Sequence, residues 1–306
     1  MPEELYAKPR KVSDISECYF YHYMDLPGYG LVSGEWDLRG KEDDYLGNVK
    51  FQAKTVLEIG TASGHLCFYM EKAGAKVTAF DLSKEQEWDI VPYANFDFTQ
   101  HIVERKQHID RTNNAYWFAH DAYKSEARMV YGTVYQIPDA IGEFDICTFG
   151  SVLLHLRDPF LALQRASMHT RKTIVITDVR VDLAENDAVP GPSGWSLMKF
   201  LRNAISVPSS RRMQFLKDAI SVPSSRRMQF LKSGISAIVP SSKRLIRFLP
   251  DSATCFPWET WWRMSPELLI EYIKILGFEN TTLSYHKQRY KEDVYDLYTI
   301  VGHRKI

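Results

Sequence analysis

The stretch VLEIGTASGHL, residues 56–66, joins an apolar strand pattern to a loop of small residues and the start of a helix. The strand pattern carries the carboxylate Glu58, and Gly60, Ala62 and Gly64 follow at every second position. Small side chains let a ligand approach the backbone closely. A loop that joins a buried strand to a helix in this way is a common cofactor site in parallel sheets. The stretch therefore predicts a cofactor-binding strand–loop–helix unit.

Strand and helix patterns alternate along most of the remaining chain. Short apolar runs typical of buried strands occur at 54–60, 76–83, 128–134, 144–156 (where the strand runs into a loop), 172–179, 279–286 and 294–303. Helical patterns occur at 64–74, 113–127, 159–169 and 265–277. This order predicts an α/β fold, a Rossmann-like doubly wound sheet. Its ligands should bind at the carboxyl ends of the strands, which carry Glu58, Asp81, Val134, Ser151 and Asp178.

Composition excludes several functional classes. The 306 residues contain 38 Lys and Arg against 38 Asp and Glu, so overall charge does not favour a nucleic-acid partner. No run approaches the roughly 20 apolar residues of a membrane span, and the first residues lack an apolar signal core. The four cysteines are scattered, without metal-ligand spacing. We expect a cytoplasmic protein with no transmembrane segment and no metal site.

The spacing within the loop discriminates between two cofactor classes. A dinucleotide loop, G-x-G-x-x-G, needs glycines at 60, 62 and 65, and only Gly60 is present. A loop for S-adenosylmethionine (SAM) instead needs an acid before a small-x-small-x-Gly run, because the acid accepts from the ammonium group of SAM. Glu58 supplies this acid, and Gly60, Ala62 and Gly64 supply the run. Asp81, 21 residues after Gly60, can accept from both ribose hydroxyls. The predicted SAM-binding residues here are Glu58, Gly60, Thr61, Ala62, Gly64, Asp81 and Leu82.

Three stretches carry a family resemblance: residues 54–83, 144–159 (FDICTFGSVLLHLRDP) and 261–278 (WWRMSPELLIEYIKILGF). They resemble class I SAM-dependent methyltransferases and, more narrowly, the tRNA wobble-uridine carboxymethyltransferase family with its uncharacterised relatives, over about residues 15–181 and 255–303. The resemblance implies a mostly parallel seven-stranded sheet with an antiparallel last strand. It also implies that the loop of Gly132, Thr133 and Val134 faces the adenine, and that Ser151 lies near the methionine part of SAM.

The sequence departs from the carboxymethyl-transferring members at two points. Those members have a tyrosine before the loop histidine and an arginine near the final strands, and both bind the extra carboxylate. Here Leu154 precedes His155, and KEDVYDLY (291–298) offers no arginine. We therefore expect methyl transfer from SAM to a small-molecule acceptor, such as a sugar or natural-product intermediate. A tRNA-modifying methyl- or carboxymethyltransferase is the first alternative, and a non-catalytic SAM- or partner-binding protein is the second.

The catalytic candidates are His155, in the loop after the fourth strand, and Asp178, at the end of the fifth. Either could act as a general base or orient a hydroxyl acceptor. The N-terminal segment adds aromatic residues such as Tyr21, His22 and Trp36. Their faces suit a sulfonium cation, or they form a packed cover over the sheet edge.

Three parts are expected: an N-terminal cover (1–50), a SAM-binding methyltransferase domain (51–181 and 263–306) and a helical basic insertion (182–262). The insertion holds tandem repeats of about 15 residues, and residues 204–217 are identical to 219–232. From Lys199 to Leu249 there are eleven Lys or Arg and one acid. The insertion could bind RNA or a phosphate-bearing substrate, lie on a membrane surface, or be a tolerated duplicated loop.

Overall fold

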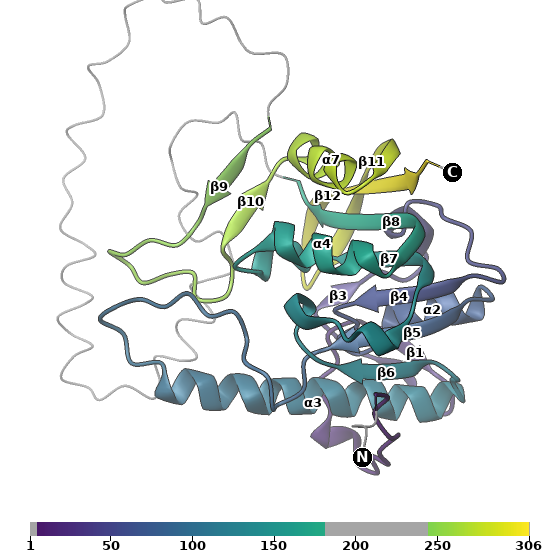
Figure 1. The fold of residues 1–306 in the computed structure, drawn as a ribbon. Coiled ribbons are helices and arrows are strands. Elements are labelled where there is room, and N and C mark those ends of the chain that lie inside the picture. The colour runs from purple at the N-terminus through teal and green to yellow at the C-terminus, as the bar shows by residue number, and fades with distance from the viewer. Residues whose placement is uncertain (1–4, 181–243, 306) are drawn as a thin grey trace, which may run out of the picture. The chain divides into compact units, whose positions relative to one another are not determined.

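A single eight-stranded sheet organises the computed structural model, which describes residues 5–180 and 244–305 (Figure 1). The repeats of the insertion lie outside the described residues. The strand order is β3 (Trp36–Asp37), β11 (Phe278–Tyr290), β12 (Asp293–Arg304), β8 (Thr170–Val179), β7 (Phe144–Gly150), β4 (Thr55–Ile59), β5 (Lys76–Asp81), β6 (Arg128–Tyr131). Strands β4 to β8 are parallel, and β12 pairs antiparallel with β8 and β11.

The Rossmann-like fold class is confirmed, with one added strand. Seven strands correspond to the expected ones, and the final strand β12 is antiparallel as expected. The eighth, the two-residue β3, comes from the N-terminal segment and pairs with the end of β11 through Arg289 and Tyr290. Because a two-residue strand has too few residues to show alternation, the sequence pattern gave no signal for it.

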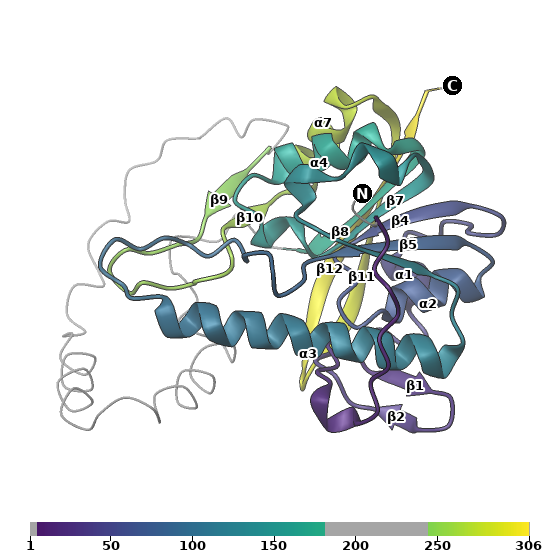
Figure 2. The ribbon, with the colours of Figure 1, turned by 60° about the horizontal axis from the view of Figure 1, so that its bottom comes forward.

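Helices cover both faces of the sheet (Figures 1 and 2). On one face α2 (His65–Lys72) and α3 (Thr99–Tyr123) contribute to one apolar cluster, and on the other α4 (Pro159–Met168) and α7 (Pro266–Ile275) contribute to a second. The strands serve both clusters because successive side chains point to opposite faces. Val56 of β4 belongs to the first cluster and Leu57 to the second.

Helix boundaries followed their capping signals more closely than their hydrophobic pattern. Asp158 accepts from the Leu161 N–H at the start of α4, and Ser265 accepts from the Leu268 N–H at the start of α7. Helix α3 begins at Thr99, earlier than the expected 113. Its first turns are polar and half exposed, so they lack the apolar periodicity from which the helix was predicted.

Short elements surround this frame. They are the hairpin β1 (Met24–Leu26) and β2 (Gly30–Val32), the helix α1 (Glu42–Tyr45), the strands β9 (Ile246–Phe248) and β10 (Trp262–Met264), and the 3-10 turns η1 (Ile15–Glu17), η2 (Val134–Gln136), η3 (Asp139–Ile141) and η4 (Leu153–His155). Strand β9 pairs antiparallel with β10. None of the described helices has both the length and the apolarity needed to cross a bilayer.

Candidate functional site

The loop after β4 turns sharply because its residues take left-handed backbone angles. Gly60 has φ +78° and Ala62 has φ +50°. A Cβ on Gly60 would lie 2.4 Å from Cγ2 of Val152, so the neighbouring loop leaves no room for a side chain. An alanine in the left-handed region is uncommon and stores strain, a feature that clusters at ligand sites. Gly60 therefore allows the loop after β4 to pack closely against the loop after β7, which contains Val152.

Two carboxylates, the buried Glu58 and the partly buried Asp81, lie beside this loop. Glu58 is 4% exposed, and its Oε2 accepts a hydrogen bond from Thr61 Oγ1 at 2.6 Å. Burial raises the pKa of Glu58 to about 7, although the Thr61 hydrogen bond opposes the shift. Asp81 accepts from the backbone N–H groups of Ala62 and Leu82, both at 2.7 Å. Burial still raises its pKa to about 6. A ligand that supplies hydrogen-bond donors or positive charge would stabilise the ionised form of both groups and oppose these shifts.

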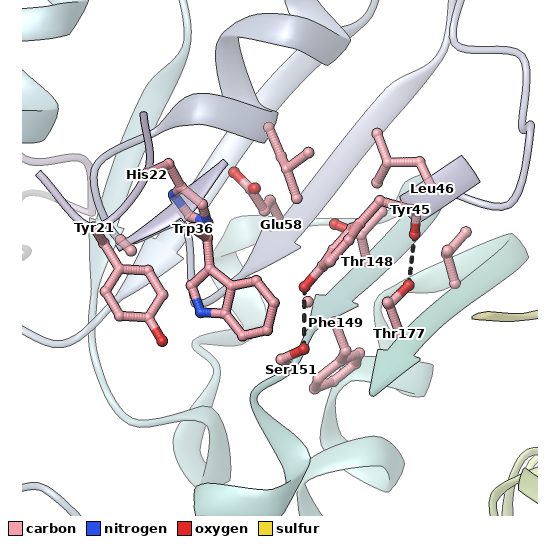
Figure 3. A pocket seen from close by; sticks show the side chains of 15 residues that line it. Tyr21, His22, Trp36, Tyr45, Leu46, Glu58, Thr148, Phe149, Ser151 and Thr177 are labelled. Atoms are coloured by element: carbon pink, nitrogen blue, oxygen red, sulfur yellow. Dashed lines mark hydrogen bonds between the residues drawn. The ribbon is translucent and has the colours of Figure 1, made fainter. Parts of the chain in front are cut away.

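A pocket at the carboxyl ends of β4 and β7 collects part of the predicted site (Figure 3). It is lined by Glu58, Gly60, Ala62 and Ser151 of the predicted set. Ser151 has φ +53°, and its Oγ lies 3.1 Å from the Tyr45 hydroxyl. The structure therefore brings the glycine loop and Ser151 to one cavity, and their contact with a cofactor stays a prediction.

The remaining predicted cofactor residues lie near the loop without lining this pocket. Thr61 and Gly64 belong to the loop, and Leu82 follows Asp81 at the end of β5. The N–H of Gly132 donates to the Asp81 carbonyl at 2.9 Å. Thr133 and Val134 follow directly, so their loop begins beside the end of β5. Their contact with a cofactor stays a prediction.

Neither catalytic candidate lines the pocket. His155 ends η4, and its Nδ1 lies 2.7 Å from the carbonyl oxygen of Glu259, while burial lowers the ring's pKa. This contact connects the loop after β7 to the segment before β10. Asp178 is buried near the end of β8, where burial raises its pKa to about 7 and the charge of Arg263 opposes the shift. Their catalytic roles stay predictions.

Sequence reasoning did not assign one wall of the pocket. Tyr21, His22, Trp36 and Tyr45, all from the N-terminal segment, line it together with Glu58 (Figure 3). The aromatic cluster of residues 18–40 was the available signal, but no spacing rule tied it to the loop. The contact depends on Ser63, whose Oγ accepts from the N–H groups of Tyr21 and His22.

A second pocket is formed by the segment after β5, the first half of α3, and Arg157 after β7. Its apolar lining includes Trp88, Phe98 and Ile102, and its cations are Arg105, Lys106 and Arg157. Glu259 pairs with Arg105 through Oε1 at 3.3 Å. The backbone carbonyl of Glu259 accepts a hydrogen bond from His155 Nδ1, so Glu259 connects the second pocket to the η4 turn.

Several solved structures resemble this chain. The N-terminal domain of EvdMO1, determined in the presence of SAH and D-fucose, is 13% identical, with 94% of this chain and 91% of that chain covered and a TM-score of 0.49. The 1,6-didemethyltoxoflavin-N1-methyltransferase of Burkholderia thailandensis, with bound 1,6-didemethyltoxoflavin and S-adenosylhomocysteine (SAH), is 12% identical, with coverages of 87% and 78% and a TM-score of 0.44. The magnesium protoporphyrin IX methyltransferase of Synechocystis PCC 6803, with bound SAH, is 9% identical, with coverages of 86% and 80% and a TM-score of 0.40.

A comparison with curated proteins gives no match. A family model described as a methyltransferase domain matches residues 40–221. The matched region includes the glycine loop, the carboxylates Glu58 and Asp81, and Ser151. Because this match spans more than half of the sequence, the chain belongs to the methyltransferase-domain family.

Proposed function

We propose that the protein binds SAM in the first pocket and transfers its methyl group to a small-molecule acceptor. The observation that carries the proposal is a pair of carboxylates hydrogen-bonded to the glycine loop: the buried Glu58, which accepts from Thr61, and the partly buried Asp81, which accepts from Ala62. Glu58 would accept from the ammonium group and Asp81 from the ribose hydroxyls. Ser151 would lie at the methionine part, and the loop of Thr133 and Val134 at the adenine.

SAM supplies a methyl group on a sulfonium, which an acceptor can take by in-line displacement. The protein's task is alignment, and positioning of two reactants can lower a barrier by roughly 7–11 kcal/mol. Tyr21 and Trp36 place aromatic faces in the pocket, and these suit a cationic ligand (Figure 3). Buried walls on the N-terminal side also keep water from the ligand.

Plain methyl transfer is favoured over carboxymethyl transfer by the charges of the pocket. Among its described lining residues there is no Lys or Arg that could pair with an extra carboxylate on the cofactor. Leu154 occupies the position where the carboxymethyl-transferring family has tyrosine, and its carbonyl accepts from the Trp261 N–H. The narrower resemblance to tRNA wobble-uridine enzymes is therefore the weaker candidate.

The second pocket supports a small acceptor. It combines apolar and aromatic walls with a few charged groups, which is typical of sites for small organic molecules. A sugar or natural-product intermediate remains the proposed substrate class. An RNA or phosphate-bearing substrate would have to rely on the basic stretch 199–249, of which residues up to 243 lie outside the described structure.

Two measurements test the proposal. Calorimetry should show binding of SAM and SAH by the wild type and by the surface control Asp121→Asn, weaker binding by Glu58→Gln, and no binding of NADH. NADH binding without SAM binding would contradict the cofactor assignment. A labelled-methyl assay should then give product with a small-metabolite extract. Product with tRNA alone would favour the RNA alternative, and SAM binding without any product would favour a non-catalytic role.

A further inference from the structure

His22 lines the same pocket as Glu58 (Figure 3). Its side chain is buried, with the residue only 8% exposed. Within the described part of the chain, its Nδ1 is buried and has no hydrogen-bond partner. Buried polar atoms are almost always hydrogen-bonded, and an exception is costly unless a ligand or water completes it. An unpaired ring nitrogen on a pocket wall therefore indicates a ligand group.

The position of His22 is fixed by its backbone. Its N–H donates to Ser63 Oγ at 3.3 Å, and Ser63 belongs to the glycine loop. On the other side, Gly34 packs against the His22 carbonyl so closely that a Cβ would lie 2.2 Å from the carbonyl carbon. His22 also forms a parallel β-bridge with Trp36. The loop expected to hold the cofactor thus also holds His22.

The ring of His22 is held by a second histidine. It stacks on His65 with the ring centroids 5.7 Å apart and an interplanar angle of 30°. His65 Nε2 lies 3.2 Å from Glu42 Oε1, so a carboxylate is close to the supporting ring. Burial keeps the pKa of His22 well below its ordinary value, so its imidazole is neutral and carries one N–H. A neutral donor of fixed position can bind an anionic oxygen without an added charge.

The other charges of the pocket indicate which ligand group this donor meets. Glu58 is the only carboxylate among the lining residues that the structure describes, and none of them is a lysine or arginine. The carboxylate of Glu58 suits an ammonium group. A zwitterionic amino-acid end also brings a carboxylate, and that group needs neutral donors here. His22 is a pocket-lining residue whose buried Nδ1 has a free hydrogen-bonding position.

We infer that His22 Nδ1–H donates a hydrogen bond to the carboxylate at the amino-acid end of the cofactor. This inference rests on the proposed function, and it adds a ligand-binding residue from the N-terminal segment. It also gives a role to Gly34 and Ser63, which position His22 through its backbone. The N-terminal segment is then part of the cofactor site.

Three ligands separate the contribution of the cofactor's carboxylate to binding from those of its amine and its nucleoside. They are SAH, its decarboxylated analogue, and 5′-methylthioadenosine, which lacks the amino-acid end. His22→Leu should weaken SAH binding about ten- to a hundredfold, the range for a lost charge-assisted hydrogen bond. Binding of the other two ligands should change less than about twofold, since neither has the carboxylate. His169→Leu is the matched control, because His169 is also buried but its Nδ1 contacts the Gly142 carbonyl just before the amino ends of β7 and β8, away from the carboxyl ends where the first pocket lies.

Two conservative variants add a rescue test. The amide nitrogen of Asn can occupy the position of Nδ1, whereas that of Gln reaches the position of Nε2. His22→Asn should therefore retain most of the SAH affinity, and His22→Gln should lose it. These two variants also decide the matter if His22→Leu does not fold.

Equal losses for SAH and the decarboxylated analogue would overturn the inference, because the missing contact would not be to the carboxylate. Unchanged SAH affinity in both His22→Leu and His22→Gln would also overturn it. Failure of the proposed function has a different signature, since the wild type would then bind neither SAH nor 5′-methylthioadenosine.

Discussion

The affinity for SAH should rise with pH, and Glu58 should be the main cause. Burial raises the pKa of Glu58 from the ordinary 4.5 to about 7, so in the empty pocket the side chain is largely protonated below pH 7. An ammonium ligand favours the ionised carboxylate, and its binding therefore releases a proton. Proton release on binding makes the affinity increase as the pH rises through the pKa of the free site.

The magnitude follows from the fraction of ionised sites. With a pKa of about 7, roughly one site in eleven is ionised at pH 6 and roughly ten in eleven at pH 8. The dissociation constant for SAH should therefore be about tenfold lower at pH 8, which corresponds to about 1.4 kcal/mol. Asp81, with a pKa of about 6, adds a further factor of about two in the same direction. The low pKa of His22 keeps that ring neutral across the range.

Calorimetric titration with SAH at pH 6, 7 and 8 measures this dependence. Glu58→Gln cannot ionise, so only the factor of about two from Asp81 should remain. Measuring proton release in two buffers of different ionisation enthalpy gives an independent check. A flat pH profile in the wild type, or the same slope in Glu58→Gln, would refute the role of a buried, ligand-binding Glu58.

Three further predictions concern the loop and the insertion. Asp81→Asn replaces one carboxylate oxygen by an NH2 group, so the side chain can no longer accept from both Ala62 N–H and Leu82 N–H or from both ribose hydroxyls. SAH binding, measured by calorimetry, should weaken about ten- to a hundredfold. Wild-type affinity in this variant would contradict the ribose role. Gly60→Ala brings a Cβ 2.4 Å from Val152 at φ +78°, so thermal denaturation should show a lower midpoint and no SAH stabilisation; an unchanged midpoint would show that the loops can separate. Deleting 213–227 should leave both the midpoint and SAH binding unchanged, because an identical segment remains; a variant that does not fold would place the repeat in the core.

The N-terminal and insertion boundaries show where local patterns stop being informative. Residues 1–50 were expected as a cover, yet Trp36 and Asp37 form a strand of the main sheet, and Tyr45 contacts Ser151. Residues 244–262 were assigned to the insertion, yet Trp261 N–H donates to the Leu154 carbonyl of the methyltransferase domain. Both contacts join residues distant in sequence, so no periodicity within either segment could have revealed them.

The sequence by itself determined the alternation of strands and helices and the chemistry of the glycine loop. Those features are local: buried parallel strands need short apolar runs, and a close-packed loop needs small residues at fixed spacing. Only the tertiary structure decided which residues share the pocket with Glu58. His22 faces it because Ser63 and Gly34 fix its backbone from two sides, and His155 is turned to the Glu259 carbonyl instead. Packing between distant segments sets the direction of each side chain, and such contacts leave no spacing signal in the chain.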